Sequence, residues 1–264
     1  MDCRSPGSTS VGRVALVTGA ASGIGRAACV ALAAGGAHVL ACSYAGDEHD
    51  VGATVAAAGA GAAAGAEVRP FAADVRDGAQ LEAACAEARR RWGRFDVVVA
   101  SAAVLSGSSL AEMTDETWNA LLDVDLGGVM RTVRAAAAAL GEGGAIVCVS
   151  STVGNDSGWP GHSHYATAKA GIMGLVRSAA LELADRGIRV NAVLPGVIDT
   201  PQSHASVARM GVPLAAVAER VPLGRVGAAS DVAAAIAFLA SADASYVTGQ
   251  GLVVDGGLAV KLPL

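Results

Sequence analysis

The sequence VALVTGAASGIG, residues 14–25, begins as a short β-branched run and ends in a cluster of glycines that opens a helical pattern. The run Val14 to Thr18 is typical of a strand, and an amphipathic stretch follows from Ile24. Glycines between a strand and a helix permit a tight turn and let the backbone approach a pyrophosphate, while the helix N-terminus offers free amides. We therefore expect a phosphate-binding loop formed by Gly19, Ser22, Gly23, Ile24 and Gly25.

The same alternation of short Val-rich runs and longer Ala-rich stretches continues along the chain and is typical of βα units that build a parallel sheet. Seven strands are predicted, at residues 14–18, 38–42, 67–71, 96–100, 145–150, 188–193 and 252–254. Helices are predicted at residues 24–34, 51–64, 79–92, 115–140, 163–186 and 230–240. The expected fold is a single α/β domain, residues 12–264, with a doubly wound parallel seven-stranded sheet and helices on both faces.

Two segments fall outside this alternation. Residues 1–11 contain charges, Pro6 and Gly7 but no apolar core, so we expect a disordered N-terminal tail and no signal peptide. Residues 200–226 contain three prolines and follow the end of a predicted strand. An insertion at that place in an open α/β sheet is a candidate substrate lid.

The composition argues against several classes of protein. The net charge is −5, with acidic and basic residues interspersed, which argues against nucleic acid as the main partner. Alanine carries much of the 53% hydrophobic fraction, and the uncharged run 51–66 is too weakly apolar to cross a membrane. Five cysteines are spread widely without metal-ligand spacing, so we expect buried thiols, no metal site and a reducing, cytoplasmic location.

The ends of the second and third strands bear on the cofactor. Ser43 and Tyr44 stand where an NAD-binding domain often carries an acid for the ribose hydroxyls. Because the missing acid removes repulsion against a 2′-phosphate, NADP(H) is the expected cofactor and NAD(H) the alternative, although no arginine stands beside Ser43 to bind that phosphate. Asp74 and Val75 are placed to meet the adenine, and the alternative role for Asp74 is a helix N-cap.

Tyr165 and Lys169 form an unusual pair, because the chain has only three tyrosines and two lysines and one of each falls four residues apart. On a helix the two side chains share one face, one turn apart. Arginine serves as the basic residue almost everywhere else, so position 169 favours an ammonium on a flexible stem. A neighbouring cation favours the phenolate form of a tyrosine, which suits general acid–base catalysis.

In combination, the ordered motifs resemble those of the short-chain dehydrogenase/reductase family. The segments that carry the resemblance are residues 18–25, Asp74, Ser150-Ser151, Tyr165-x-x-x-Lys169, Arg189-Val190-Asn191-Ala192-Val193, Pro195-Gly196-Val197-Ile198-Asp199-Thr200 and Tyr246-Val247-Thr248-Gly249-Gln250. The resemblance covers residues 12–260 and implies a Rossmann domain in which a tyrosine exchanges a proton with the substrate oxygen while hydride passes to or from nicotinamide.

The resemblance also implies residue roles. Tyr165 would be the general acid/base, Ser151 would hydrogen-bond the substrate oxygen, and Lys169 would hold the nicotinamide ribose and favour the phenolate of Tyr165. The family places its active serine three residues before a glycine, so Gly154 selects Ser151, and Ser150 should face the other side of the strand. Further cofactor contacts are expected at Ala102, Tyr165, Lys169, Pro195, Gly196, Ile198 and Thr200.

Two departures from the family pattern stand out. The fourth strand usually ends in Asn-Asn-Ala-Gly, whereas residues 100–103 read Ala-Ser-Ala-Ala. Asp125 stands where relatives commonly place an asparagine that supports a water relay to the lysine. We hypothesise that Asp125 is a catalytic residue in this relay and, being anionic, raises the pKa of Lys169 and weakens its help to Tyr165. The alternative is an aspartate bonded to the backbone, with no kinetic effect.

The expected function is that of an NAD(P)(H)-dependent oxidoreductase interconverting a ketone and a secondary alcohol on a small molecule. One alternative is a ketoreductase like the 3-oxoacyl-(acyl-carrier-protein) reductases, which would need a basic rim to dock its acidic carrier. The other is a catalytically silent nucleotide-binding scaffold. Trp159, His162 and His164 stand near Tyr165 and are candidates for the substrate pocket. The resemblance further implies a homodimer or homotetramer.

Overall fold

The computed structural model describes residues 12–211 and 213–260, so the predicted N-terminal tail lies outside the described residues. The strands are β1 (Val14–Thr18), β2 (His38–Ser43), β3 (Val68–Ala72), β4 (Val97–Ala100), β5 (Ala145–Val149), β6 (Arg189–Pro195), β7 (Ile198–Asp199), β8 (Gly227–Ala228) and β9 (Gly251–Val254). The α-helices are α1 (Gly23–Ala34), α2 (Val51–Ala60), α3 (Gly78–Trp92), α4 (Asp115–Leu122), α5 (Val129–Ala139), α6 (Ser163–Glu182), α7 (Pro201–Met210), α8 (Leu214–Ala218) and α9 (Ala229–Ala240). A π-helix, η1 (Asp123–Gly128), joins α4 to α5, and short 3-10 turns follow α6 and α9 as η2 (Ala184–Arg186) and η3 (Ala242–Ala244).

The main sheet is parallel and has the strand order β3-β2-β1-β4-β5-β6-β9. The order reverses between β1 and β4, which pair so that Thr18 lies opposite Ala100 at their carboxyl ends. In open α/β sheets the crevice outside the carboxyl ends of the strands at such a reversal binds ligands. The predicted doubly wound seven-stranded sheet in a single domain is confirmed.

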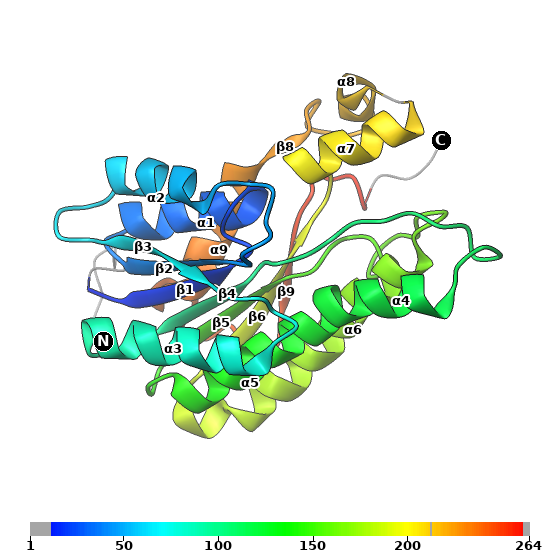
Figure 1. Ribbon diagram of the computed structural model, residues 1–264. Helices are drawn as coiled ribbons and strands as arrows, with labels where there is room; N and C mark the ends of the chain where they lie inside the picture. Colours follow the sequence, from blue (N-terminus) through cyan, green and yellow to red (C-terminus); the bar gives the residue numbers. More distant parts are fainter. Residues whose placement is uncertain (1–11, 212, 261–264) are drawn as a thin grey trace.

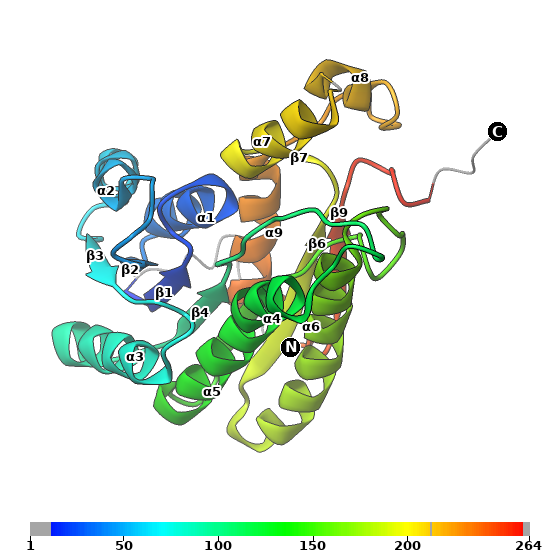
Figure 2. The ribbon, with the colours of Figure 1, turned by 45° about the vertical axis from the view of Figure 1, so that its right-hand side comes forward.

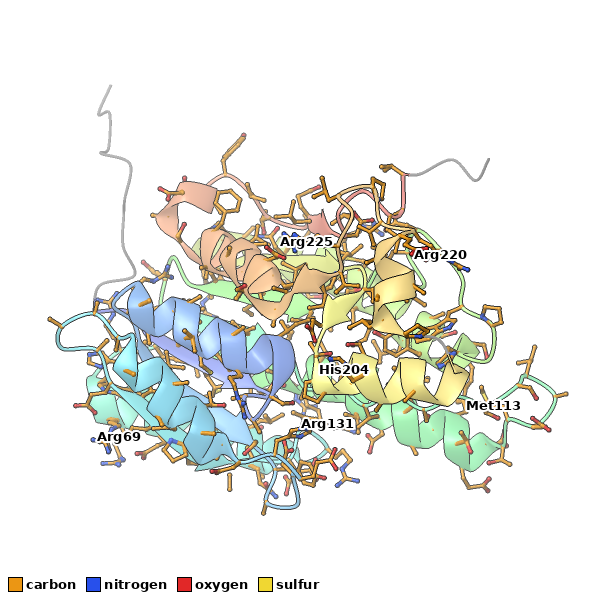
Figure 3. The ribbon with its side chains drawn as sticks, turned by 90° about the horizontal axis from the view of Figure 1, so that it is seen from above. Arg69, Met113, Arg131, His204, Arg220 and Arg225 are labelled. Atoms are coloured by element: carbon orange, nitrogen blue, oxygen red, sulfur yellow. The ribbon has the colours of Figure 1, made fainter. Side chains whose placement is uncertain are left out.

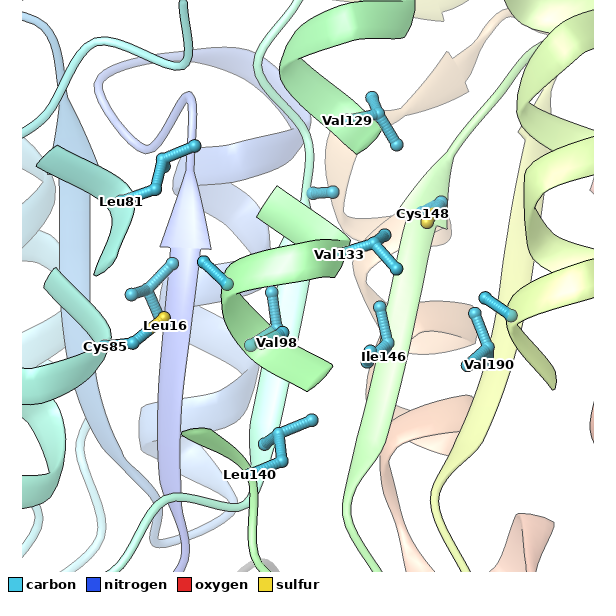
Figure 4. Packing of buried hydrophobic residues seen from close by; sticks show 14 of the residues in the cluster. Leu16, Leu81, Cys85, Val98, Val129, Val133, Leu140, Ile146, Cys148 and Val190 are labelled. Atoms are coloured by element: carbon cyan, nitrogen blue, oxygen red, sulfur yellow. The ribbon is translucent and has the colours of Figure 1, made fainter. Parts of the chain in front are cut away.

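Helices cover both faces of this sheet. Helices α1, α2 and α9 lie on one side, and α3, α5 and α6 lie on the other (Figures 1 and 2). Each face has its own apolar core, because alternate residues of a buried parallel strand point to opposite sides and all of them must be apolar. Figure 4 shows one such row crossing the sheet beneath α5, made by the register partners Leu16, Val98, Ile146 and Val190.

The prediction of one continuous helix over residues 115–140 is wrong in its middle. Helix α4 ends at Leu122, and the backbone passes through the π-helix η1 before α5 begins at Val129. Such short π-helical segments shift the side chains that follow and often occur at functional sites. Here the turn holds Asp125 fully buried. Gly128 permits the close packing of the turn, since a Cβ there would lie 2.6 Å from Cγ2 of Val75.

Other boundaries also differ from the prediction. Helix α2 ends at Ala60, and the predicted helix 163–186 ends as an α-helix at Glu182 before the short turn η2. Within the segment 200–226, α7 and α8 stand above the carboxyl end of the sheet, between β7 and β8 (Figure 1). These two short strands pair in parallel, with Ile198 opposite Gly227. The lid function of this segment stays a prediction.

The buried cysteines agree with expectation where the chain is described. Cys29, Cys42, Cys85 and Cys148 are buried free thiols, while Cys3 lies outside the described residues. Burial raises the pKa of Cys29 and of Cys148 to about 12, so both stay protonated near neutral pH. Among residues 12–211 and 213–260, no helix has the length and apolar character needed to span a membrane.

Candidate active site

The glycine-rich loop after β1 packs closely against the end of β4. Gly19 has a φ of +65°, and a Cβ on it would lie 2.7 Å from the Cα of Ala102. A Cβ on Gly25 would lie 2.1 Å from the carbonyl oxygen of Gly19. Thr18 Oγ1 accepts hydrogen bonds from the backbone N–H groups of Ser101 and Ala102, at 3.1 and 3.3 Å. The glycine-rich loop therefore packs tightly against the end of β4, and positions 19 and 25 both require glycine.

The N-terminus of α1 has the properties of an anion site. Ser22 is the N-cap residue, but its side chain makes no capping hydrogen bond, and the first turn carries no acidic residue. The free amides and the positive end of the helix dipole are therefore available to a phosphate. Thr200 lies across this N-terminus, because a Cβ on Gly23 would come within 3.2 Å of its Cγ2. The geometry fits a dinucleotide pyrophosphate, while the individual contacts stay predictions.

The residues expected around the adenosine half lie on the rim beside β2 and β3. Ser43 is the last residue of β2 and is buried, whereas Tyr44 is exposed. Asp74 forms an ion pair with Arg76 at 2.6 Å, and this hydrogen bonding lowers the pKa of Asp74. The N-cap of α3 is Asp77, which accepts from the N–H of residue 79 at 2.9 Å, so the alternative role considered for Asp74 belongs to Asp77. Arg76, a half-exposed cation on this rim, was not predicted from the sequence.

At the end of β5 two consecutive serines have different partners. The hydroxyl of Ser150 donates to the carbonyl oxygen of Lys169 at 2.7 Å and so ties the strand to α6. The hydroxyl of Ser151 accepts from the N–H of Val153 at 3.1 Å. The hydroxyl proton of Ser150 is thus used in joining β5 to α6. The bond from Val153 uses the hydroxyl of Ser151 as an acceptor, so it does not consume the hydroxyl proton of Ser151.

Gly154 and Asn155 fasten the loop after β5 to the tyrosine helix. Gly154 has a φ of +91°, and a Cβ there would lie 2.1 Å from the carbonyl oxygen of Ala166. The amide of Asn155 donates to the carbonyl oxygens of Ser151 at 2.8 Å and Lys169 at 3.3 Å. Any larger residue at position 154 would push Ser151 away from the helix that carries Tyr165, which gives a physical reason for the glycine.

Lys169 and Asp125 form a buried ion pair beside Tyr165. Lys169 Nζ lies 3.2 Å from Asp125 Oδ2, with side-chain exposures of 2% and 0%. The same Nζ lies 3.4 Å from the carbonyl oxygen of Val149 and 5.4 Å from the ring centroid of Tyr165. The other oxygen of Asp125 accepts from the backbone N–H of Val104 at 2.8 Å. Asp125 thus pairs directly with the lysine and also bonds the backbone, while its place in a water relay and its kinetic effect stay predictions.

The charges of this pair depend on each other. Burial raises the pKa of Asp125, and the nearby ammonium of Lys169 partly offsets that rise. Burial by itself would lower the pKa of Lys169, but the charge of Asp125, and to a smaller degree Tyr165, raises it above the ordinary value. Lys169 is therefore a firmly protonated cation in the interior.

The residues before Tyr165 form a small aromatic and histidine cluster. Trp159 stacks on His162 with ring centroids 3.7 Å apart and meets Tyr165 edge-on at 6.3 Å. His164 is fully buried, and its Nε2 lies 3.1 Å from the hydroxyl oxygen of Ser106. Trp159, which contacts Tyr165, and His162, which stacks on Trp159, remain candidates for the substrate pocket, whereas His164 bonds the loop that follows β4.

The segment expected to meet the nicotinamide runs from the end of β6 into α7. A Cβ on Gly196 would lie 2.6 Å from Cβ of Asp255, so this turn also requires glycine. Ile198 is buried in β7, and the hydroxyl of Ser203 donates to its carbonyl oxygen at 2.6 Å. His204 of α7 pairs with Asp199 at 2.7 Å, and Figure 3 shows it beside the N-terminal end of α1. The base of the predicted lid is thus fastened close to the glycine-rich loop.

Most of the predicted site residues gather at one end of the sheet, at or near the carboxyl ends of its strands. The structure adds three polar contacts that the sequence analysis missed: those of Thr18, of Asn155 and of the N–H of Val104. The bonds of Thr18 and of Val104 join segments that are distant in the sequence, and Asn155 also bonds the carbonyl oxygen of Lys169 in α6, so no local pattern signals these contacts. In the part of the chain that is described, no cluster of His, Cys, Asp and Glu is arranged to hold a metal ion.

Comparison with known proteins places this geometry in a family. Residues 19–259 match the family model described as enoyl-(acyl carrier protein) reductase. The chain is 38% identical over 251 residues to the 3-oxoacyl-(acyl-carrier-protein) reductase of Thermotoga maritima, covering 94% of this chain and 98% of that protein. It is also 38% identical over 254 residues to the enzyme of the same name from Escherichia coli strain K12, covering 94% and 97%.

Solved structures agree with the sequence relatives. A short-chain type dehydrogenase/reductase from Mycobacterium marinum superposes with a TM-score of 0.85 at 32% identity, covering 95% of this chain and 96% of that one. A levodione reductase superposes with a TM-score of 0.87 at 33% identity, covering 96% and 99%. The chain therefore belongs to the short-chain dehydrogenase/reductase family and is an NAD(P)-dependent oxidoreductase that acts on CH–OH groups.

Proposed function

We propose that this protein is an NADPH-dependent ketoreductase that converts a small-molecule ketone to a secondary alcohol, with Tyr165 as the proton donor. The observation that carries the proposal is that Lys169, a buried cation, lies one helical turn from Tyr165 and is paired with Asp125. A cation fixed at this distance favours release of the phenolic proton. Its burial strengthens the electrostatic effect, because little water is available to screen it.

The same geometry supports the remaining catalytic roles that we propose. Ser151 donates a hydrogen bond to the carbonyl oxygen of the ketone, and Tyr165 transfers its proton to that oxygen as the alcohol forms. Lys169 binds the cofactor ribose and supports loss of the proton from Tyr165. Asp125 keeps Lys169 charged and in place, and it takes part in the path by which Tyr165 recovers its proton.

The cofactor half of the site consists of the glycine-rich loop and the rim residues. Gly19, Ser22, Gly23, Ile24 and Gly25 hold the pyrophosphate on the N-terminus of α1, which carries no acidic residue in its first turn. When bound, the nicotinamide nucleotide supplies the hydride. Around it we place Ser43, Tyr44, Asp74, Val75, Ala102, Pro195, Gly196, Ile198 and Thr200. NADPH is preferred over NADH because β2 ends in Ser43 and not in an acid.

A second candidate is reduction of 3-oxoacyl groups carried on acyl carrier protein. It is favoured by the 38% identity to two reductases of that name over nearly the full length of both proteins. A carrier protein is acidic and needs a basic rim. Arg131, which would belong to such a rim, already pairs with Asp123 at 2.6 Å. A free small molecule therefore remains the first candidate.

The test is to measure oxidation of NADPH and of NADH with four kinds of acceptor. These are a cyclic diketone, a linear ketone, a 3-oxoacyl group on a short thiol and the same group on acyl carrier protein. The proposal predicts turnover of a free ketone, with a higher kcat/KM for NADPH than for NADH. Turnover confined to the carrier-bound group would favour the second candidate. Cofactor binding without turnover of any acceptor would contradict both.

A further inference from the structure

The loop of residues 101–113, which joins β4 to α4, is bonded at three alternate residues to η1, to α6 and to the turn before α6. The N–H of Val104 donates to Asp125 in η1 at 2.8 Å, and the hydroxyl of Ser106 lies 3.1 Å from His164 Nε2 in α6. The N–H of Ser108 donates to the carbonyl oxygen of Gly161 at 2.9 Å. The loop therefore runs along the start of α6, the helix that carries Tyr165.

Of these three contacts, the one made by His164 is the hardest to explain by a purely structural role. The ring is fully buried, and its Nδ1 is one of three buried side-chain polar atoms without a hydrogen-bond partner among the described residues. Leaving a buried polar atom unpaired costs free energy that an apolar side chain of similar size would avoid. The chain nevertheless carries a histidine directly before Tyr165, and its Nε2 is used to hold Ser106.

The surroundings keep the His164 ring neutral. Burial lowers its pKa, and His162 from the preceding turn lowers it further, while Asp125 from η1 acts in the opposite direction. A neutral imidazole has one donor and one acceptor, so the rotating hydroxyl of Ser106 complements either tautomer. The bond between the loop and α6 therefore persists near neutral pH whichever nitrogen carries the proton.

We propose that His164 is a positioning residue, which holds Ser106, and with it the loop 101–113, at a fixed distance from Tyr165, so that the ketone is bound with its carbonyl facing the proton donor. The inference rests on the proposed ketone reduction. It assigns to His164 and Ser106 a share of substrate binding that they exert through the loop and not by contact with the reacting atoms. The N-terminus of α6 carries Tyr165 itself, so any loosening of the loop is felt at the site.

The first test compares Ser106→Ala with Ser109→Ala. Ser109 is in the same loop, but its hydroxyl bonds Glu112 at 2.6 Å within the loop and does not reach α6. Loss of a hydrogen bond of ordinary strength corresponds to about a fivefold change in an equilibrium constant. We expect Ser106→Ala to raise the KM for the ketone about fivefold, with the NADPH dissociation constant unchanged, and Ser109→Ala to behave as wild type.

The second test uses His164 itself. His164→Leu fills the space of the ring without a polar atom. It should raise the ketone KM about tenfold, because the bond to Ser106 is lost and the loop is no longer oriented by it. His164→Asn keeps a donor that reaches toward the loop and should recover part of the loss. Since both residues act through one bond, the double variant with Ser106→Ala should be no worse than His164→Leu alone.

Hydrogen exchange of residues 101–113 separates failure of this inference from failure of the proposed function. Ser106→Ala should speed exchange of the loop amides relative to Ser109→Ala, whether or not a ketone substrate has been found. Equal exchange in the two variants, or variants with lowered melting temperature but wild-type KM, would assign His164 a purely structural role. Additive effects of His164→Leu and Ser106→Ala on KM would also overturn the proposal.

Discussion

At the scale of single residues, Asp125 is the side chain that most changes the chemistry of its neighbours. Its carboxylate lies 3.2 Å from Lys169 Nζ with both groups buried, so the two charges depend on each other. Because the folded state raises the pKa of Lys169 above the ordinary value of 10.5, the stabilisation that the protonation of Lys169 contributes is fully present below pH 10.5. It is lost as the pH rises through the raised pKa.

Asp125→Asn tests whether this charge tunes catalysis. Because the charge of Asp125 raises the pKa of Lys169 against the effect of burial, removing the anion lowers the pKa of Lys169, and the alkaline limb of the pH–rate profile should move to lower pH. The variant also leaves a buried ammonium without its counter-ion, which should lower the free energy of unfolding by about 3 kcal/mol. The measurements are kcat/KM against pH and chemical denaturation.

Asp123→Asn is the matched control. Asp123 lies in the same π-helix and pairs with Arg131 at 2.6 Å, but its side chain is 44% exposed. An exposed ion pair contributes at most about 1 kcal/mol to the free energy of unfolding. The partner of Asp123 is Arg131 and not Lys169. The control should therefore keep the wild-type profile. Superimposable profiles for wild type and Asp125→Asn would refute the tuning role of Asp125.

At the scale of secondary-structure elements, the turn from β1 into α1 is among the most tightly packed parts of the site. In Gly25→Ala the new Cβ would meet the carbonyl oxygen of Gly19 at 2.1 Å, so backbone must shift. We expect a loss of about 2 kcal/mol in stability, as for other overpacked positions, and at least a tenfold weaker binding of NADPH. Denaturation and fluorescence titration measure the two effects.

Gly59→Ala provides the comparison for that variant. Gly59 lies within α2, and a Cβ there would meet nothing within 4 Å. Alanine in an open helix position should stabilise the protein by about 1 kcal/mol and leave NADPH binding unchanged. If Gly25→Ala bound NADPH as tightly as Gly59→Ala does, the glycine-rich loop would not hold the cofactor in the way we describe.

Elements with strong local patterns were predicted from the sequence, and elements shaped by tertiary contacts were not. The strand at residues 14–18 has the predicted bounds because a Val-rich run between turn residues defines it. The π-helix η1 at Asp123–Gly128 differs from an α-helix only in which backbone groups are hydrogen-bonded to each other, and no residue pattern signals it. The two-residue strands β7 and β8 exist only because they pair with each other.

The same division holds for the candidate site. The glycine-rich loop and the Tyr165 and Lys169 pair could be recognised because their spacing is local. The bond from Thr18 to the end of β4 spans more than eighty residues, and its role could not be read from either segment alone. His164 was considered for the substrate pocket, but its bond with Ser106 depends on how the loop after β4 folds back onto α6.

At the scale of the whole molecule, the outer side of β9 is the surface expected to contact a second copy of the chain. β9 is an edge strand of the sheet, and Leu252 and Val253 on it are exposed. Leu181 of α6 is 81% exposed and lines the same depression as Val253. An exposed apolar edge strand beside an exposed leucine favours association, and the predicted homodimer or homotetramer would cover both.

Leu181→Glu should therefore lower the molar mass of the assembly in size-exclusion chromatography with light scattering, because it places a charge in the apolar contact. Leu110→Glu is the control, since Leu110 is 75% exposed and lies in the loop between β4 and α4, away from β9. It should keep the wild-type mass. A monomeric wild type, or a Leu181→Glu protein of unchanged mass, would contradict this assignment of the interface.

The proposed function of the molecule depends on proton donation by Tyr165, and Tyr165→Phe tests that proposal most directly. The variant removes the hydroxyl and keeps the ring that packs against Trp159. We predict that kcat/KM for ketone reduction with NADPH falls about 10³-fold, as expected for loss of a general acid, while the dissociation constant for NADPH stays within about twofold of wild type. A variant that binds NADPH normally and keeps more than about a tenth of the wild-type kcat/KM would contradict the account.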